Sequence, residues 1–247
     1  CIYRFGVSDP AGEQATLGAP HFGWRRYVTL ITSSHVWLLA PTWIAINAAL
    51  GLYTSQSIFQ LIREPDPRFH DQQLMGGFVG AQIALGLAAG LVVFFAGLAF
   101  WGERFKRFRR TTIILYGIGG GALSVVAAYF VNHSGGLPFL VPVYGVGVIA
   151  GLFVLAGATP AALGLLADIS ESFPADRGAI MGLYSVFLAV GQIAGSFIGA
   201  EAAKASGLDG IFMSTLVLLV VALVPLYRLR GVEHIVGAPG EAGPALG

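Results

Sequence analysis

The chain has 247 residues, of which 55% are hydrophobic and 11% are charged. Its mean hydropathy of +0.75 implies more apolar surface than one soluble core can bury, so we expect lipid to be the solvent. A formal net charge of +1 gives no support for nucleic-acid binding, and the one cysteine, Cys1, excludes an internal disulfide framework.

Six stretches of the chain are apolar and long enough to span a membrane as helices, which takes about 20 mostly apolar residues. They cover residues 35–61, 76–101, 111–131, 139–166, 178–200 and 208–227. The sequence therefore predicts an all-α integral membrane protein, with a bundle of six transmembrane helices over residues 35–230. Residues 1–34 are expected to be a cytoplasmic segment. Residues 231–247, rich in Gly, Pro and Ala, are expected to be a disordered cytoplasmic tail.

The Lys and Arg residues are concentrated on one side of this predicted bundle. Six spans place both termini on the same side, so the loops fall into two groups. The group that shares the side of the termini holds eleven basic residues: Arg4, Arg25, Arg26, Arg104, Lys106, Arg107, Arg109, Arg110, Arg177, Arg228 and Arg230. The other group holds Arg63, Arg68 and Lys204, which completes the 14 of the chain. Because cytoplasmic loops carry the excess of Lys and Arg, we expect a multi-pass protein of the cell membrane with both termini cytoplasmic.

Glycines recur at four-residue spacing on the second and fifth predicted spans. The positions are Gly76, Gly80, Gly86 and Gly90 on the second, and Gly178, Gly182, Gly191, Gly195 and Gly199 on the fifth. Small residues so spaced let another helix approach closely, so we expect them to serve in helix packing. Each of these spans also carries one glutamine that we expect to be buried. The shared pattern suggests two groups of three helices related by an inverted repeat.

The predicted spans carry a few uncharged polar residues and no Asp, Glu, Lys or Arg near their centres, so no ion-coupling site is evident. The polar residues of interest are Asn47, Thr54, Ser55, Gln56, Gln82, Tyr144 and Gln192. Helical spacing places Asn47, Thr54 and Ser55 on one face. For Asn47 and Thr54, a hydrogen bond between helices and a ligand contact remain equal alternatives, whereas for Gln82 and Gln192 the former is favoured. No cluster has metal-ligand spacing, and we expect no cofactor.

The loop after the second span resembles a family motif. Residues 99–110, AFWGERFKRFRR, are similar to the second-half copy of the Gly-x-x-x-Asp-Arg-x-Gly-Arg-Arg motif of the major facilitator superfamily. Glu103 stands at the position of the acid and Arg104 at that of the next Arg. The basic cluster is matched by Arg107, Arg109 and Arg110, while Ala99 and Lys106 replace the two Gly.

A second stretch carries the same resemblance. The residues from Glu171 to Ala200 are similar to the loop and helix that follow the tenth span in this superfamily. The residues at matching places are Pro174, Arg177, Gly178 and Gly182. Both elements fall at the corresponding cytoplasmic loops of a six-helix half. The resemblance therefore implies the C-terminal half of a twelve-helix transporter, and the start at Cys1 rather than Met is in keeping with a truncated chain.

The resemblance implies secondary transport of a small organic solute by alternating access, in a lipid bilayer and together with a missing N-terminal six-helix half. In the family the first and fourth helices of a half line the cavity, which makes Asn47, Thr54 and Tyr144 candidates for substrate contact. The second and fifth face the other half, so Gln82 and Gln192 are expected at the cavity edge. The loop residues, Glu103 and Arg104 above all, are expected to form a cytoplasmic gate. Alternatively, the basic cluster only sets topology and meets anionic lipid.

Two other classes of function compete with transport. An intramembrane serine protease of the rhomboid type needs a Ser nucleophile and a His base within reach of each other. Ser196 follows a glycine, but no predicted span has a His near its centre, so no enzymatic activity is expected. A membrane scaffold or sensor that does not transport is disfavoured by the short tail but stays open.

Overall fold

The computed structural model describes residues 28, 36–104, 108–171 and 176–236, and these residues form helices and no strand. The helices are α2 (Val36–Ile62), α3 (Gly80–Arg104), α4 (Arg110–Asn132), α5 (Val141–Leu155), α6 (Ala158–Glu171) and α7 (Arg177–Val236), with two 3-10 turns, η2 (Pro67–Phe69) and η3 (Pro138–Leu140). Apart from Val28, the predicted N-terminal segment 1–34 lies outside the described residues. Helix α7 continues through residues 231–236, into the segment predicted as a tail.

The architecture is that of an all-helical membrane protein. In the part of the chain that the structure describes, four helical stretches are long and apolar enough to cross a membrane: Gly80–Arg104, Arg110–Asn132, Pro138–Glu171 and Arg177–Gly231. Helix α2 is not among them, and its C-terminal half carries the polar residues Thr54, Ser55 and Gln56. The most apolar window of α3 is only 6% buried, so most of this helix faces outward from the bundle.

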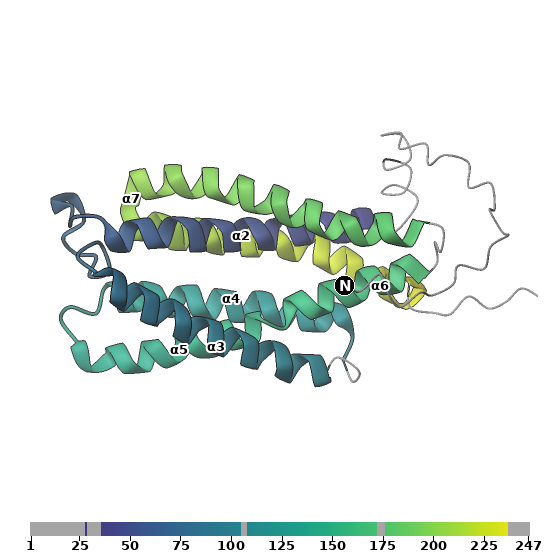
Figure 1. The fold of residues 1–247 in the computed structure, drawn as a ribbon, viewed down its shortest axis with the longest axis horizontal. Coiled ribbons are helices and arrows are strands. Elements are labelled where there is room, and N and C mark those ends of the chain that lie inside the picture. The colour runs from purple at the N-terminus through teal and green to yellow at the C-terminus, as the bar shows by residue number, and fades with distance from the viewer. Residues whose placement is uncertain (1–27, 29–35, 105–107, 172–175, 237–247) are drawn as a thin grey trace, which may run out of the picture.

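Helix α7 consists of two arms that run in opposite directions (Figure 1). The backbone leaves the helical region at Ser206 (φ −142°, ψ 19°) and at Gly207 (φ 61°, ψ −138°). A positive φ of this kind suits glycine because it has no Cβ. The buried side chain of Gln72 stabilises the turn, since its Nε2 donates to the Ser206 carbonyl (3.0 Å) and its Oε1 accepts from the Leu208 N–H (2.9 Å). We call residues 177–205 the first arm and residues 208–236 the second arm.

The predicted span over residues 139–166 is interrupted between α5 and α6. Pro160 has no N–H to bond to the carbonyl of Ala156, four residues earlier, so the helical ladder cannot be continuous here. Gly157 at this break lies against the indole of Trp101 on α3, and the Trp101 Nε1–H donates to the Phe153 carbonyl at 3.2 Å. The break therefore joins α5 and α6 to the end of α3.

The helices pack in two layers, one made of α2 and both arms of α7 and the other of α3, α4 and α5, and the layers meet where α4 contacts α7. Helix α2 packs along both arms of α7, while α5 packs on α3 and α4, and α4 contacts α7. The larger hydrophobic cluster lies between the layers and includes fully buried residues of α2, α4, α6 and α7, among them Trp43, Ile113, Leu166 and Leu229. Trp43 also stacks on Tyr184 of the first arm, with ring centroids 5.2 Å apart.

Glycines bring the backbones close at the helix crossings. A Cβ added to Gly191 on the first arm would lie 2.6 Å from the Ile44 carbonyl oxygen and 2.7 Å from the Asn47 Cβ on α2. Gly195 and Gly199 also face α2, against Ala48 and Leu52. By contrast, a Cβ on Gly182 would meet nothing within 4 Å. The packing stripe of the first arm therefore covers residues 191–199, and α2 of the same bundle occupies it.

Candidate functional site

The predicted cavity residue Asn47 lies inside the bundle. Its side chain is 2% exposed, its Nδ2 donates to the Trp43 carbonyl one turn earlier at 2.8 Å, and its Cβ lies at the crossing with Gly191. Thr54, which follows on α2, is exposed and its hydroxyl donates to the Leu50 carbonyl at 2.8 Å. The structure therefore separates these two candidates: Asn47 lies in a helix crossing and Thr54 on the surface.

A line of polar groups joins α2 to the first arm beside Thr54. The Gln56 Nε2 donates to the Ser196 carbonyl at 3.5 Å, and the Ser196 hydroxyl lies 3.4 Å from that of Ser55 and donates to the Gln192 carbonyl at 2.8 Å. We call Ser55, Gln56, Gln192 and Ser196 the polar seam. A surface hollow of about 470 Å³ opens beside it, lined by Gln192, Ile193, Ser196, Phe197 and Ala200.

The two predicted glutamines do not occupy buried positions. The Gln192 backbone packs on Gly51, but its side chain is exposed. Gln82 is also exposed and lies in the first turn of α3, where its Oε1 accepts from the Val79 N–H at 3.1 Å. This contact satisfies the backbone N–H of the residue before the helix, as a Gln three residues after the N-cap often does. Helix α3 begins at Gly80, later than the sequence predicted, so Gln82 is far from the helix centre.

Tyr144 lies near the start of α5 and packs against α4. Its ring stacks on that of Phe130, with centroids 5.3 Å apart and planes 23° apart. It is half-buried. Among the predicted cavity residues, Gln192 therefore lines the hollow and Thr54 is exposed on α2 next to Ser55 of the polar seam, whereas Tyr144, Gln82 and Asn47 lie elsewhere.

The described gate residues gather at one end of the bundle, where α3 and α6 end and α4 and α7 begin (Figure 1). Glu103, Arg109, Glu171, Arg177 and Gly178 are exposed there. The Arg104 guanidinium lies over the Phe100 ring, 3.6 Å from its centroid, in a cation–π contact. Arg107 and Pro174 lie outside the described residues.

The charged end contains an ion pair that the sequence did not suggest. Arg110, the first residue of α4, binds Asp168 of α6 in a two-pronged contact: its Nε donates to Oδ2, and its Nη2 donates to Oδ1 at 2.9 Å. Such a bidentate pair fixes both the distance and the orientation of the partners. Asp168 is the first charged residue after the long uncharged run that ends at Ala167. That position was the one sequence feature that could have singled it out.

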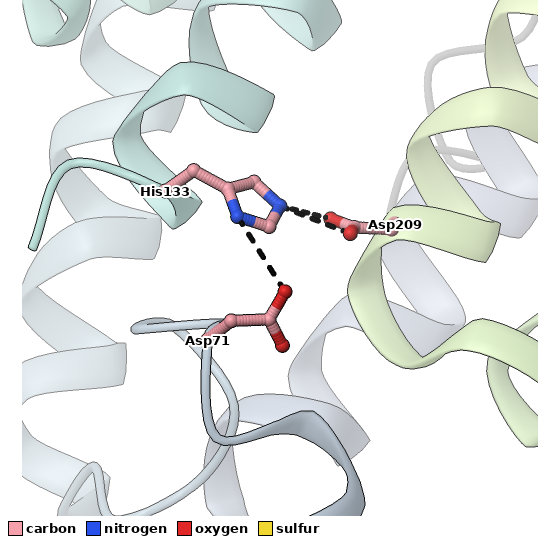
Figure 2. Close-up of side chains that lie close together, drawn as sticks. All are labelled: Asp71, His133 and Asp209. Atoms are coloured by element: carbon pink, nitrogen blue, oxygen red, sulfur yellow. Dashed lines mark hydrogen bonds and ion pairs between the residues drawn. The ribbon is translucent and has the colours of Figure 1, made fainter.

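The opposite end of the bundle carries a cluster of three titratable side chains, Asp71, His133 and Asp209 (Figure 2). The His133 Nε2 lies 2.9 Å from both carboxylate oxygens of Asp209, and its Nδ1 lies 3.9 Å from Asp71 Oδ2. These residues come from the loop after α2, the end of α4 and the second arm. Because they are far apart in the sequence, no local spacing could have revealed them.

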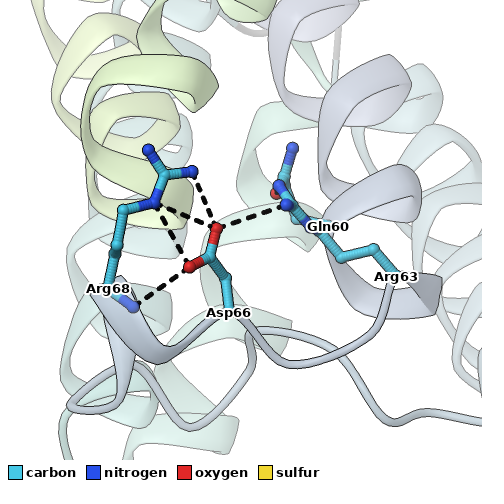
Figure 3. Close-up of polar contacts among 4 residues, drawn as sticks. All are labelled: Gln60, Arg63, Asp66 and Arg68. Atoms are coloured by element: carbon cyan, nitrogen blue, oxygen red, sulfur yellow. Dashed lines mark hydrogen bonds and ion pairs between the residues drawn. The ribbon is translucent and has the colours of Figure 1, made fainter.

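The loop after α2 is held by its own charges (Figure 3). The Arg68 guanidinium donates to Asp66, with Nη2 to Oδ2 at 2.8 Å, and the Arg68 backbone N–H donates to Asp66 Oδ1 at 3.0 Å. Arg63 reaches the same carboxylate at 3.4 Å and Gln60 Oε1 at 3.1 Å. The hydrogen bonds from the Arg68 side chain and backbone lower the pKa of Asp66 to about 2.

Comparison with protein families decides the class of this bundle. The family model of the Major Facilitator Superfamily matches residues 27–245 of the 247. The chain belongs to the Major Facilitator Superfamily. Members of this superfamily are membrane transporters, so the rival interpretation as an intramembrane enzyme is not favoured. Searches of the curated proteins and of the solved structures found no match.

Proposed function

We propose that this superfamily member is a six-helix half of a secondary transporter that moves a small organic solute by alternating access. The observation that carries the proposal is the polar seam, with its exposed Gln192 and adjoining hollow, beside the apolar side chains of Ile193, Phe197 and Ala200. Polar side chains on a membrane helix are expected to face protein or a wet cavity rather than lipid. The seam and Thr54 would form one wall of the solute cavity, and the other half would form the opposite wall.

The contacts between helices support an inverted repeat of three helices each. The first group would be α2, α3 and α4, and the second α5 with α6 followed by the two arms of α7. Helix α2 packs on both arms, and α5 in turn packs on α3 and α4, so each first helix pairs with the last two of the other group. Glycines bring both pairs together, Gly191 against α2 and Gly97 against the Phe153 carbonyl of α5, 2.6 Å from an added Cβ. Such reciprocal packing, with the first helix of each group on the last two helices of the other, is expected for two groups related by a two-fold axis.

The outer surface of α3 supports a partner half and a lipid environment. Leu85, Val92 and Phe95 are 74%, 70% and 62% exposed. Leaving side chains of this size in water costs about 1.5–3 kcal/mol each relative to burying them. We propose that lipid and an N-terminal six-helix half cover these residues in the cell membrane, with the charged end of the bundle in the cytoplasm.

The charged end supports a gate. Glu103 and Arg104 end α3, where they would form ion pairs with the other half in one state and meet water in the other. The Arg110–Asp168 pair would keep α4 and α6 together while the two halves rock. Since no wall residue of the seam is charged, a neutral or amphiphilic solute is the substrate class that fits this half.

A screen for stabilising solutes tests this function directly. The whole transporter, purified in detergent, is heated with small organic solutes, and those that raise its melting temperature are then assayed for uptake into proteoliposomes. We expect Gln192→Leu to abolish the shift and reduce uptake, while Val217→Leu, on an exposed apolar part of the second arm, leaves both unchanged. A solute that is transported equally well by both variants would contradict the seam as the solute site.

A further inference from the structure

We propose that Asp71, His133 and Asp209 form a binding site for a divalent transition-metal ion, of which Zn²⁺ fits best, at the end of the bundle opposite the gate. This site is separate from the polar seam, and the proposal goes beyond the transport of a solute. Each residue can offer one ligand atom, and these atoms all lie within 4.8 Å of one another. The three side chains converge from three separate elements (Figure 2).

The charge of the cluster calls for a cation. Two carboxylates flank one imidazole, and within the described residues no Lys or Arg side chain forms an ion pair with Asp71 or Asp209; the nearby cations Arg68 and Lys204 pair with other acids. With a neutral ring, the two carboxylates leave a local charge of two negative units. A divalent ion would neutralise both, whereas a proton on His133 would leave one.

A movement of the exposed Asp71 side chain would bring the ligand atoms to the positions that Zn²⁺ requires. Bonds of about 2.0–2.2 Å to nitrogen and oxygen place tetrahedral ligand atoms roughly 3.4 Å apart. The Asp209 oxygens lie 2.9 Å from the His133 Nε2, whereas Asp71 faces the other ring nitrogen, Nδ1, at 3.9 Å. An ion binds through one ring nitrogen, and the three ligand atoms lie within 4.8 Å of one another, so the Asp71 carboxylate would have to move by roughly 1.4 Å to reach that separation. The Asp71 side chain is 59% exposed on its loop and can make such a shift.

The surroundings of Asp209 hold one side of the site in place. The Asn132 Nδ2 donates to Asp209 Oδ1 at 3.0 Å. Asn132 is itself fully buried and fixed by the loop, since its Oδ1 accepts from the Leu74 N–H at 3.0 Å and its carbonyl accepts from the Gln73 N–H at 2.8 Å. Amide groups that orient a ligating carboxylate in this way strengthen metal sites.

The ligand types select the class of ion. Imidazole suits Zn²⁺ and its transition-metal neighbours, whereas Mg²⁺ and Ca²⁺ prefer sites made of oxygen alone. Three protein ligands leave a fourth position to water, which the exposed edge at Asp71 can supply. Bound Zn²⁺ would tie the loop after α2 to the end of α4 and to the second arm. If the proposed topology holds, the site faces the outside of the cell, but binding itself does not depend on it.

Zinc titration of the whole transporter tests the site. The protein is treated with EDTA, purified in detergent and titrated with Zn²⁺ in competition with a chromophoric chelator, with melting temperature as a second readout. We expect each chain to bind one Zn²⁺ ion in competition with the chelator, and bound Zn²⁺ to raise the melting temperature. Asp71→Asn, an exposed change that should fold normally, and His133→Asn should each weaken binding by roughly 10-fold or more. Glu201→Gln, an acid paired with Lys204, should bind like the wild type.

Several outcomes would overturn the proposal. The first is that the protein does not bind Zn²⁺ stoichiometrically. The second is that Asp71→Asn and His133→Asn bind Zn²⁺ as tightly as the wild type does. A third outcome would assign the cluster to a proton instead: acid pH raises the melting temperature of the wild type but not of His133→Asn, and Zn²⁺ has no effect. X-ray absorption of the zinc-loaded protein should show a nitrogen and oxygen ligand shell, and a shell without an imidazole nitrogen would also contradict the site.

Discussion

Arg110 and Asp168 are joined in a bidentate ion pair that connects the first residue of α4 to α6 at the charged end of the bundle. Both side chains are partly shielded, with 24% and 30% exposure. Asp168→Asn removes the charge from a bidentate contact between α4 and α6, so we expect a loss of about 1–3 kcal/mol in stability. A lower melting temperature of the purified transporter would show it, and a double exchange, Arg110→Asp with Asp168→Arg, should recover part of the loss. An unchanged melting temperature in Asp168→Asn would mean that the pair contributes nothing.

Gly191 tests the close crossing of α2 and the first arm. A Cβ there would meet the Ile44 carbonyl oxygen at 2.6 Å, so we expect Gly191→Ala to destabilise the protein by about 1–3 kcal/mol through overpacking. Gly182 is the matched control on the same arm because its added Cβ meets nothing within 4 Å. We expect Gly182→Ala to be neutral or slightly stabilising. Equal melting temperatures for the two variants would be incompatible with this crossing.

The helical segments could be predicted from the sequence because hydropathy reports directly on residues that lipid must surround. The breaks were harder to predict. The interruption near Ala156 follows from Pro160 and could have been foreseen, whereas the start of α3 at Gly80 instead of 76 depends on backbone bonds of the preceding loop. Gly76 and Gly77 have positive φ, and the Gly77 N–H donates to the Arg63 carbonyl at 3.2 Å, which keeps this stretch out of the helix.

The candidate sites were less accessible to sequence reasoning than the helices. Polar character singled out Gln192 and Thr54, which are exposed, but it also singled out Asn47, which lies in a helix crossing. Helical periodicity gives the face of a residue and not what covers that face. Asp168 and the cluster around His133 depend on contacts between distant segments, and sequence spacing carries no information about these.

Glu103 is the most direct test of the proposed gate. It is exposed at the end of α3, so its removal should affect the fold of this half very little. We expect Glu103→Gln to insert normally and to transport several-fold more slowly, because the ion pair with the other half is lost. Surface labelling measures insertion, and uptake into proteoliposomes measures transport. If both stay at wild-type values, the gate is wrong and the basic loop only sets orientation.

Asp66 should play no part in any pH dependence of transport near neutrality. Its folded pKa of about 2 lies below the ordinary value of 3.8, so the stability from its contact with Arg68 is fully present above about pH 4. That stability is lost only as the pH falls through about 2. Asp66→Asn should therefore leave the midpoint of a transport profile measured from pH 5 to pH 8 unchanged. A shifted midpoint would contradict the lowered pKa.

Accessibility of the polar seam from the two sides of the membrane tests alternating access most directly. With Cys1 and any cysteine of the other half replaced by Ser, Gln192→Cys is exposed to a membrane-impermeant maleimide from either face of oriented vesicles. We expect labelling from both faces, and a transported solute should slow labelling from one face while speeding it from the other. Val217→Cys, on the apolar second arm, should not be labelled. Labelling of Gln192→Cys from one face only, under every condition, or no labelling at all, would contradict the account.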